Sequence, residues 1–207
     1  MPPALAPRRP RPSAAAPPPK REALLRAAID VFAERGYFNA QVADIARAAQ
    51  VAAGTVYLYF RSKDDLLVSI FERTMREALA EGKQAIATLP DPIDQLRTIA
   101  RLHLARLGRD RNLAVVFQVE LRQSTKFMER FSSTFLRDYL GLIRGAIARG
   151  QTTGVFRPDL NATAAAKIFF GALDEMATNW MLSRRRYTLE AEAGLVVDLF
   201  VNGARAR

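Results

Sequence analysis

Cysteine is absent from this 207-residue sequence, and His103 is its only histidine. Without cysteine the chain can form no disulfide, thiolate metal site or cysteine nucleophile, and the absence fits a reducing compartment such as the cytoplasm. One histidine leaves few groups for acid–base catalysis near neutral pH, and no nucleophile–base pair can be assembled. We therefore expect no catalytic residue, no metal site, no cofactor and no enzymatic activity.

Long apolar runs are also missing. Charged residues interrupt every hydrophobic stretch before the roughly 20 residues that a membrane-spanning helix requires. The arginines near the N-terminus are not followed by the apolar segment of a secretory signal. Because 49% of the residues are hydrophobic and 25% charged, the composition is that of an ordinary globular protein. We therefore expect a cytoplasmic protein without a membrane segment.

Proline is rare after the first 19 residues, which hold eight of the eleven prolines and three arginines. Such a segment can form neither helix nor strand and lacks the apolar content to fold. We expect a disordered tail over 1–19. Its arginines either touch DNA phosphates or form a solvated tail without a defined role, and charge runs are more often the latter.

From Lys20 onward the hydrophobic spacing is helical, and no segment alternates as a half-buried strand would. Ser62 is suited to cap the helix that follows it. The sequence predicts an all-α protein with about nine helices, at 20–35, 42–49, 53–59, from 62 onward, 92–108, 111–124, 126–151, 161–184 and 188–203.

Two short helices close together carry the most informative pattern, QVADIARAAQVAAGTVYLYF from Gln41 to Phe60. Small residues let the two helices approach, and Val51 fills the angle between them. The second helix, only seven residues long, cannot be stable alone. It must be held by its neighbours while Gly54 and the hydroxyls that follow it face outward. This arrangement is typical of a recognition helix that enters the DNA major groove.

The same stretch resembles the DNA-binding domain of the TetR family of bacterial repressors. The resemblance rests on AERGY from Ala33, DIA from Asp44, GTVY from Gly54 and SKDDL from Ser62. Two positions depart from the family pattern. Gln41 stands where threonine often begins the second helix, and Ala53 where lysine or arginine is frequent.

The resemblance implies a set of DNA-binding residues. Gln41 and Thr55 would hydrogen-bond phosphates or base edges, and Lys63 would bind a phosphate as a point charge. The two tyrosines would contact phosphates through their hydroxyls, although packing is the alternative role for them, and Phe60 is expected in the core. The predicted DNA-binding residues are Gln41, Ala53, Gly54, Thr55, Tyr57, Tyr59 and Lys63.

Two further stretches, QVELRQS from Gln118 and FG…DE…T…W from Phe170, resemble the fatty-acid-degradation regulators within this family, often called FadR. That likeness implies a long-chain acyl-CoA effector, which releases the repressor from β-oxidation genes. It also implies a homodimer that pairs through the last two helices and reads a palindromic operator.

Such an effector requires an apolar tunnel and cations for its phosphates. The net charge is +10, and residues 97–130 hold eight basic but three acidic residues. The apolar side chains on these helices could instead form an ordinary core, and the basic residues could instead form a solvated helix face. The predicted ligand-binding residues are His103, Leu104, Arg106, Leu107, Arg109, Phe117, Leu121, Arg122, Phe131, Phe135 and Tyr139. Glu120 also lies in an apolar stretch, where its carboxylate requires a partner from another element.

The sequence thus divides into a tail (1–19), a helix-turn-helix domain (20–66) and an effector-binding and dimerisation domain (67–207). Two alternatives stay open. A regulator of the same family could respond to a drug or a free fatty acid instead. A basic helical membrane or adaptor protein would bind lipid and show no operator selectivity.

Overall fold

The computed structural model describes residues 20–123 and 135–205, and within these ranges the fold is helical. Nine α-helices and two 3₁₀ turns are present there, and the described residues contain no strand beyond an isolated bridge between Phe156 and Arg205. The predicted all-α class and helix number are confirmed. The predicted tail at 1–19 lies outside the described residues.

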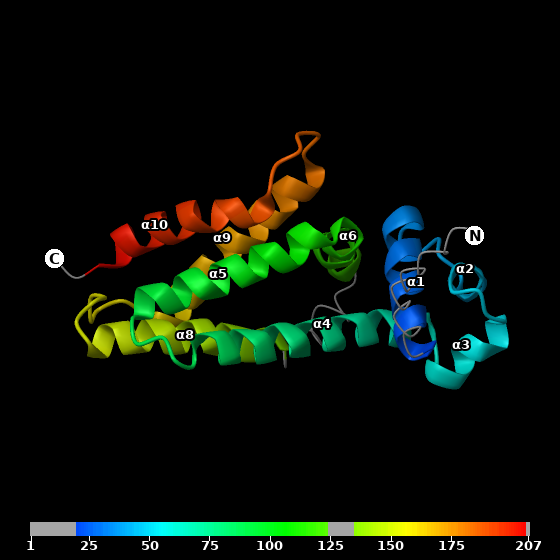
Figure 1. Cartoon of the computed structure of the whole chain (residues 1–207), viewed down its shortest axis with the longest axis horizontal. Helices are drawn as coiled ribbons and strands as arrows, with labels where there is room; N and C mark the ends of the chain where they lie inside the picture. Colours follow the sequence, from blue (N-terminus) through cyan, green and yellow to red (C-terminus); the bar gives the residue numbers. More distant parts are fainter. Residues whose placement is uncertain (1–19, 124–134, 206–207) are drawn as a thin grey trace, which may run out of the picture.

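The first three helices form a unit at one end of an elongated molecule (Figure 1). They are α1 (Lys20–Arg35), α2 (Val42–Ala48) and α3 (Ala53–Tyr59). Helix α1 is followed by Gly36, whose φ of +75° lies in the left-handed region that glycine adopts without strain. The buried side chains of Ile45 and Val56 anchor the two short helices, which could not persist alone.

Helix α4 (Lys63–Ile86) connects this unit to the rest of the molecule (Figure 1). Ser62 caps it as predicted, because its Oγ accepts a 3.1 Å hydrogen bond from the Asp65 amide. The domain boundary expected between residues 66 and 67 falls inside this helix. The two parts therefore share one continuous helix, which can transmit a movement of the C-terminal helices to the N-terminal unit.

The remaining helices pack around α5, which contacts α4, α8, α9 and α10. Acidic or amide side chains at Asp91, Asp110 and Asn161 cap three of them by accepting hydrogen bonds from amides of the first turn. The helices are α5 (Pro92–Arg109), α6 (Arg111–Gln118), α8 (Arg137–Thr152), α9 (Ala162–Leu182) and α10 (Ala193–Ala204). None of the helices within the described ranges is long and apolar enough to cross a membrane.

Two predicted helices differ from what the structure shows. The helix expected at 111–124 ends at Gln118, and the chain continues as a 3₁₀ turn, Glu120–Gln123. The helix expected at 188–203 begins with a 3₁₀ turn, Leu189–Glu192, before α10. The first part of the helix expected at 126–151 falls largely outside the described residues.

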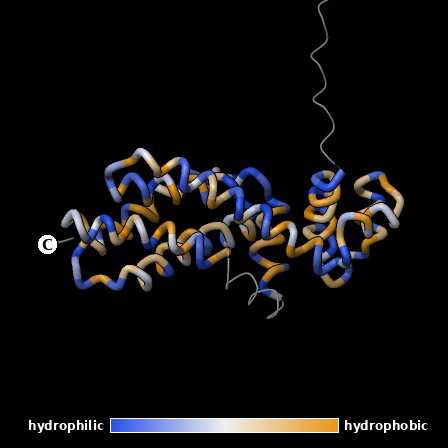
Figure 2. Tube along the Cα trace, turned by 90° about the horizontal axis from the view of Figure 1, so that it is seen from below, coloured by the Kyte–Doolittle hydropathy of each residue, from blue (hydrophilic) through white to orange (hydrophobic). Residues whose placement is uncertain are grey.

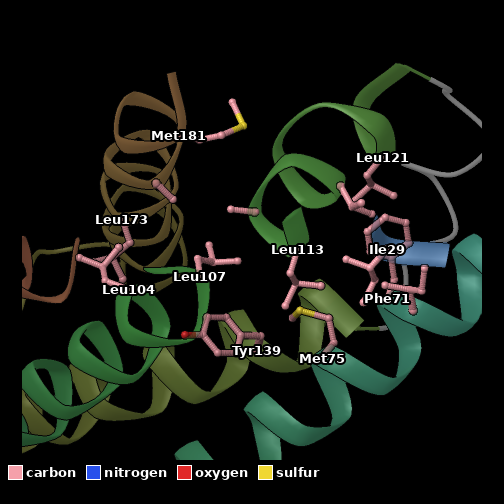
Figure 3. Packing of buried hydrophobic residues seen from close by; sticks show 14 of the residues in the cluster. Ile29, Phe71, Met75, Leu104, Leu107, Leu113, Leu121, Tyr139, Leu173 and Met181 are labelled. Carbon is pink, nitrogen blue, oxygen red and sulfur yellow. The ribbon is translucent and has the colours of Figure 1, made fainter. Parts of the chain in front are cut away.

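A single hydrophobic core extends through both parts of the molecule. Hydrophobic and hydrophilic residues are interspersed along the helices (Figure 2), and the buried apolar residues pack into this core. Ile29 of α1, Phe71 of α4 and Leu121 of the 3₁₀ turn lie together (Figure 3), so the N-terminal unit is packed against the C-terminal helices.

Candidate DNA-binding surface and ligand cavity

Helix α3 exposes the side chains that the sequence assigned to an external contact. Tyr57 is 58% exposed, Leu58 81% and Tyr59 41%, whereas Val56 and Phe60 are buried. Phe60 is therefore in the core, as predicted. Burial does not explain the two tyrosines, and three large neighbouring side chains in solvent form a surface suited to a partner.

The other predicted positions on this surface are open as well. Ala53 and Gly54 are exposed at the start of α3, and a Cβ added at Gly54 would meet no atom within 4 Å. Gln41 is exposed at the N-terminus of α2, while Thr55 is half-buried. A flat surface can therefore approach the backbone of α3 closely at Gly54.

Lys63 lines the same surface as Gln41 and Tyr57 but also binds main-chain carbonyls. Its Nζ donates to the carbonyl oxygens of Tyr37 (2.7 Å), Phe38 (3.1 Å) and Ala40 (2.9 Å). An ammonium group has three protons, and all three are used here. Lys63 therefore closes the loop between α1 and α2, and its contact with a phosphate stays a prediction.

Arg61 supplies a cation in the same region. It lines a shallow hollow between α2, α3 and the start of α4 together with Gln41, Ala53 and Tyr57. Among the described residues its guanidinium has no ion-pair partner. Sequence reasoning missed Arg61, because the resemblance drew attention to the neighbouring lysine.

The C-terminal helices enclose a cavity of about 260 Å³. Its wall comes from α4, α5, α8, α9 and the segment 117–122, and much of it is apolar: Met75, Leu102, Leu107, Phe117, Leu121, Leu136, Leu142 and Phe170. The volume lies just below the range of about 300–1,000 Å³ that is common for small-molecule sites. The cavity therefore suits a narrow apolar group.

Several of the predicted ligand-binding residues meet at this cavity. Those that line it are His103, Arg106, Leu107, Phe117, Leu121, Arg122 and Tyr139. On α5 the spacing of three and four residues places His103, Arg106 and Leu107 on one face of the helix. Their contact with a ligand stays a prediction.

Three predicted residues do not line the cavity. Leu104 follows His103 directly, so it points about 100° away and is fully buried in the core. Arg109 lies in a neighbouring hollow between α4 and α5. Phe135 packs against the core, because α8 presents Leu136 and Tyr139 to the cavity instead. Phe131 lies outside the described residues.

His103 and Tyr139 form a buried polar pair in the cavity wall. The imidazole Nδ1 lies 3.1 Å from the Tyr139 hydroxyl, and Nε2 has no partner among the described residues. Burial lowers the pKa of His103 to about 4, with nearby Arg106 lowering it further and Asp174 opposing the shift. The imidazole is therefore neutral near pH 7, and its Nε2 can accept or donate one hydrogen bond.

Four of the six basic residues that the structure describes between 97 and 123 form ion pairs with carboxylates: Arg97, Arg101, Arg106 and Arg122. Arg106 contacts Glu77 at 3.3 Å and Glu81 at 2.5 Å, and Arg122 forms an ion pair with Asp174. Gln118 also donates to Asp174, at 3.0 Å. These contacts orient the polar end of the cavity, but they leave little uncompensated charge for an anion.

The segment that lines the cavity also binds the N-terminal unit. The buried Glu120 carboxylate accepts a 2.7 Å hydrogen bond from the backbone amide of Tyr37, which confirms that its partner comes from another element. Before this segment, at the start of α6, Asn112 donates to Asp30 of α1 at 2.8 Å. The chain between these two contacts contains the cavity residues Phe117 and Gln118.

Two family models match the chain and together cover it from residue 24 to residue 203. The model described as bacterial regulatory proteins of the tetR family matches residues 24–70, and the model described as the C-terminal region of YsiA-like proteins matches residues 71–203. The chain belongs to the TetR family. The exposed surface of α3 is accordingly that of the helix-turn-helix of a TetR repressor, and its C-terminal helices form the family's second domain.

Similar TetR proteins have been identified over nearly the full length. The fatty acid metabolism regulator protein of Bacillus subtilis (strain 168) is 35% identical over 185 residues, which cover 89% of this chain and 95% of that protein. The solved structure of the fatty acid degradation regulator FadR from Bacillus halodurans is 36% identical, with a TM-score of 0.86, and the match covers 93% of this chain and 100% of the other.

The crystal structure of FadR from B. subtilis in complex with stearoyl-CoA is 34% identical, with a TM-score of 0.84 and coverage of 89% of this chain and 99% of the other. These relatives are transcriptional regulators, not enzymes. Within the described residues of this TetR repressor, no group of three or more histidine, aspartate or glutamate side chains could hold a metal ion.

Sequence reasoning missed part of the cavity of this TetR repressor. Met75, Ala78 and Gly82 of α4 line the wall, and none of them is among the predicted ligand-binding residues. Their spacing of three to four residues was a usable signal, because small residues on a buried helix face leave room for a ligand or a neighbouring helix. Leu142 of α8 also lines the wall and is not among the predicted ligand-binding residues.

Proposed function

We propose that this TetR repressor controls fatty-acid degradation genes and that long-chain acyl-CoA releases it from operator DNA. The observation that supports this most directly is the position of the cavity. Its wall includes the segment 117–122, and Glu120 in that segment binds the amide of Tyr37 in the DNA-binding unit. A ligand that moves this segment therefore acts on the helix-turn-helix through a direct contact.

The chemistry of the wall favours an acyl chain. Aliphatic and aromatic side chains surround most of the space, and the polar residues among them largely bind one another. A chain of methylene groups gains roughly 0.8 kcal/mol for each group that is buried. The relatives named as fatty acid regulators, one of them bound to stearoyl-CoA, support the same ligand class.

The DNA contacts that we propose come from α2 and α3. Tyr57 and Tyr59 contact phosphates through their hydroxyls, Thr55 and Gln41 contact phosphates or base edges, and Gly54 allows close approach. Arg61 adds a second cation beside Lys63 on this surface. These residues are exposed or half-buried on the same unit, and no intramolecular ion pair of the described residues occupies Arg61.

The operator is palindromic in this proposal, because the repressor acts as a two-fold dimer in the cytoplasm. Four large apolar side chains of the last two helices are more than half exposed: Ile168, Leu182, Leu195 and Leu199. A second copy that covers them would remove this apolar surface from water. It would also place two recognition helices one turn of DNA, roughly 34 Å, or a multiple of it, apart.

Release follows from a shift between two populations. Acyl-CoA binds better to a conformation in which the two helix-turn-helix units are wrongly spaced for the operator, so operator affinity falls by the coupling free energy. The same coupling requires that operator DNA weakens acyl-CoA binding by an equal factor.

The first test is binding of the purified protein to a palindromic site from its own upstream region, at fixed salt concentration. We expect palmitoyl-CoA to weaken binding, and free coenzyme A and free palmitate to leave it unchanged. Operator binding that no acyl-CoA alters would contradict the effector. Release by palmitate or by an unrelated hydrophobic drug would favour the alternative ligand classes.

A variant separates the two sites in this test. Thr55→Ala combined with Tyr57→Phe should weaken operator binding and leave palmitoyl-CoA binding unchanged, because both residues lie on the DNA-binding unit. If the double variant lost both activities while it stayed folded, the assignment of a separate DNA-binding element would be wrong. Selective loss of operator binding with retained lipid binding would also exclude a membrane adaptor.

A further inference from the structure

A basic groove of about 930 Å³ lies between the C-terminal part of α4 and α8. Its lining includes four cationic side chains and a single acidic one, namely Lys83, Arg137, Arg144 and Arg149 with Asp138. The hollow next to Arg106, between α4 and α5, is lined by three basic and three acidic residues instead. Of these two openings beside the cavity, only the groove has an excess of positive charge.

Three of the four cations of the groove have no carboxylate partner among the described residues, whereas Arg137 pairs with Asp138. Among the described residues, Lys83 and Arg144 form no ion pair and no hydrogen bond. Arg149 is held by a neutral partner, because its Nε donates to the Gln95 amide oxygen at 3.0 Å. This hydrogen bond orients the guanidinium without cancelling its charge, and a guanidinium fork is well matched to phosphate oxygens.

Glycines leave the groove open on α8. Gly141 and Gly145 are four residues apart, so they lie on the same face of the helix, and both line the groove. A Cβ added at Gly141 would meet no atom within 4 Å. The space beside Gly141 is therefore free for a ligand, and a Cβ added at Gly145 would lie 3.5 Å from the Arg149 guanidinium, which places that cation beside the same face.

One side chain, Leu142, belongs to the walls of both the groove and the apolar cavity, and Gly82 lines the cavity opposite it. A Cβ added at Gly82 would lie 2.9 Å from Leu142 Cδ2, so the leucine rests directly on the glycine backbone. A rotation of the Leu142 side chain to another staggered conformation would connect the two spaces without any movement of the helices.

We infer that this groove binds the phosphate-bearing end of an acyl-CoA, while the acyl chain passes Leu142 into the cavity. The inference rests on the effector proposed above and assigns its phosphates to the groove and its acyl chain to the cavity. The anionic phosphates meet Lys83, Arg144 and Arg149, and the apolar chain meets the apolar wall. The groove thus replaces the arginines of residues 97–122 as the site for the phosphates, because four of the six described basic residues there pair with carboxylates.

The test is a charge reversal, Lys83→Glu with Arg144→Glu, in the full-length protein. Calorimetry would measure the affinity for palmitoyl-CoA and for palmitate at low and high salt. We expect the variant to bind palmitoyl-CoA at least tenfold more weakly and with a smaller salt dependence, because exposed charge pairs are screened by salt. Palmitate should bind within about twofold of the wild-type affinity, since it has no phosphates.

A matched control reverses two exposed arginines outside the groove, Arg185→Glu with Arg186→Glu, and so changes the net charge equally. It should leave both affinities unchanged. Operator binding and the circular dichroism of each variant report whether it is folded. Arg109→Glu tests the opening between α4 and α5, where the sequence placed a phosphate contact.

The outcomes separate this inference from the proposed function. If the groove variant binds palmitoyl-CoA as tightly as the wild type, the groove is not the phosphate site, although the effector itself stands. A loss of affinity in Arg109→Glu but not in the groove variant would likewise overturn the groove. Wild-type protein that binds palmitate but not palmitoyl-CoA would overturn the effector and the groove together.

Discussion

His103 shows how one buried side chain makes stability depend on pH. Its imidazole is neutral in the folded protein, because burial lowers its pKa to about 4 from the ordinary value of 6.5. Between these two values the unfolded chain binds a proton that the folded chain does not. Folding stability from this group is therefore complete above about pH 6.5 and is lost as the pH falls toward about 4.

We predict that His103→Gln reduces this pH dependence. The wild type should lose about 2 kcal/mol through this group between about pH 7.5 and about pH 5, and the variant should lose correspondingly less. Urea denaturation of both proteins at the two pH values measures the difference, and carboxylates common to both cancel from the comparison. An identical loss in the two proteins would show that His103 is already protonated or solvated in the folded state.

For single residues, the sequence predicted correctly which side chains are exposed and which are buried where helical spacing determines this. Tyr57 and Tyr59 are exposed and Phe60 is buried, as expected. It did not predict the loop contacts of Lys63, because the three carbonyls that accept its protons belong to a loop whose shape no residue spacing encodes. The ion pairs of Arg106 were missed for a similar reason, since Glu77 and Glu81 belong to another helix.

Among the elements, the short segment after α6 determines how the cavity meets the DNA-binding unit. The sequence predicted one helix over 111–124, because it contains no glycine or proline that would end it. The α-helix nevertheless ends at Gln118, and the 3₁₀ turn that follows contains Glu120, which binds Tyr37. Contact with α1 and the core, which a single segment cannot show, accounts for the difference.

We predict that Glu120→Ala weakens the coupling between effector and operator. The Tyr37 amide would lose its buried acceptor, at a cost of about 1–3 kcal/mol in stability. Palmitoyl-CoA should then reduce operator affinity by a smaller factor than in the wild type. Thermal unfolding measures the first effect, and operator titrations with and without palmitoyl-CoA measure the second.

Two further variants sharpen this test. Glu120→Gln retains an oxygen acceptor and should restore most of the coupling, whereas the exposed Glu34→Ala on α1 should change neither quantity. If Glu120→Ala lowered stability but left the coupling factor as in the wild type, the contact would be structural only.

In the whole molecule, the DNA-binding unit and the cavity are joined by α4 and by the core around Ile29, Phe71 and Leu121 (Figures 1 and 3). The sequence predicted both units and most of the helices, because each has its own apolar period. The boundary that it placed between residues 66 and 67 lies inside α4, because the helical periodicity continues through these residues. The groove at Lys83 and Arg144 could not be predicted, because its cations come from helices far apart in the chain.

Assembly is the property of the whole molecule that the exposed faces of α9 and α10 predict. Leu195 and Leu199 are four residues apart on one face of α10, and Leu199 is 66% exposed. We predict that Leu199→Glu places a charge in the dimer interface and yields monomers in light scattering. Operator affinity should fall by about a hundredfold or more, because two half-sites can no longer be bound together.

The monomeric variant should still bind palmitoyl-CoA, since each chain has its own cavity and groove. Ala148→Glu, at an exposed position of α8, introduces the same charge away from these helices and should stay dimeric. A Leu199→Glu protein that remained a dimer with wild-type operator affinity would place the interface elsewhere. The exposed leucines of α10 would then require another partner, because apolar side chains that cluster on a surface tend to be covered in the functional assembly.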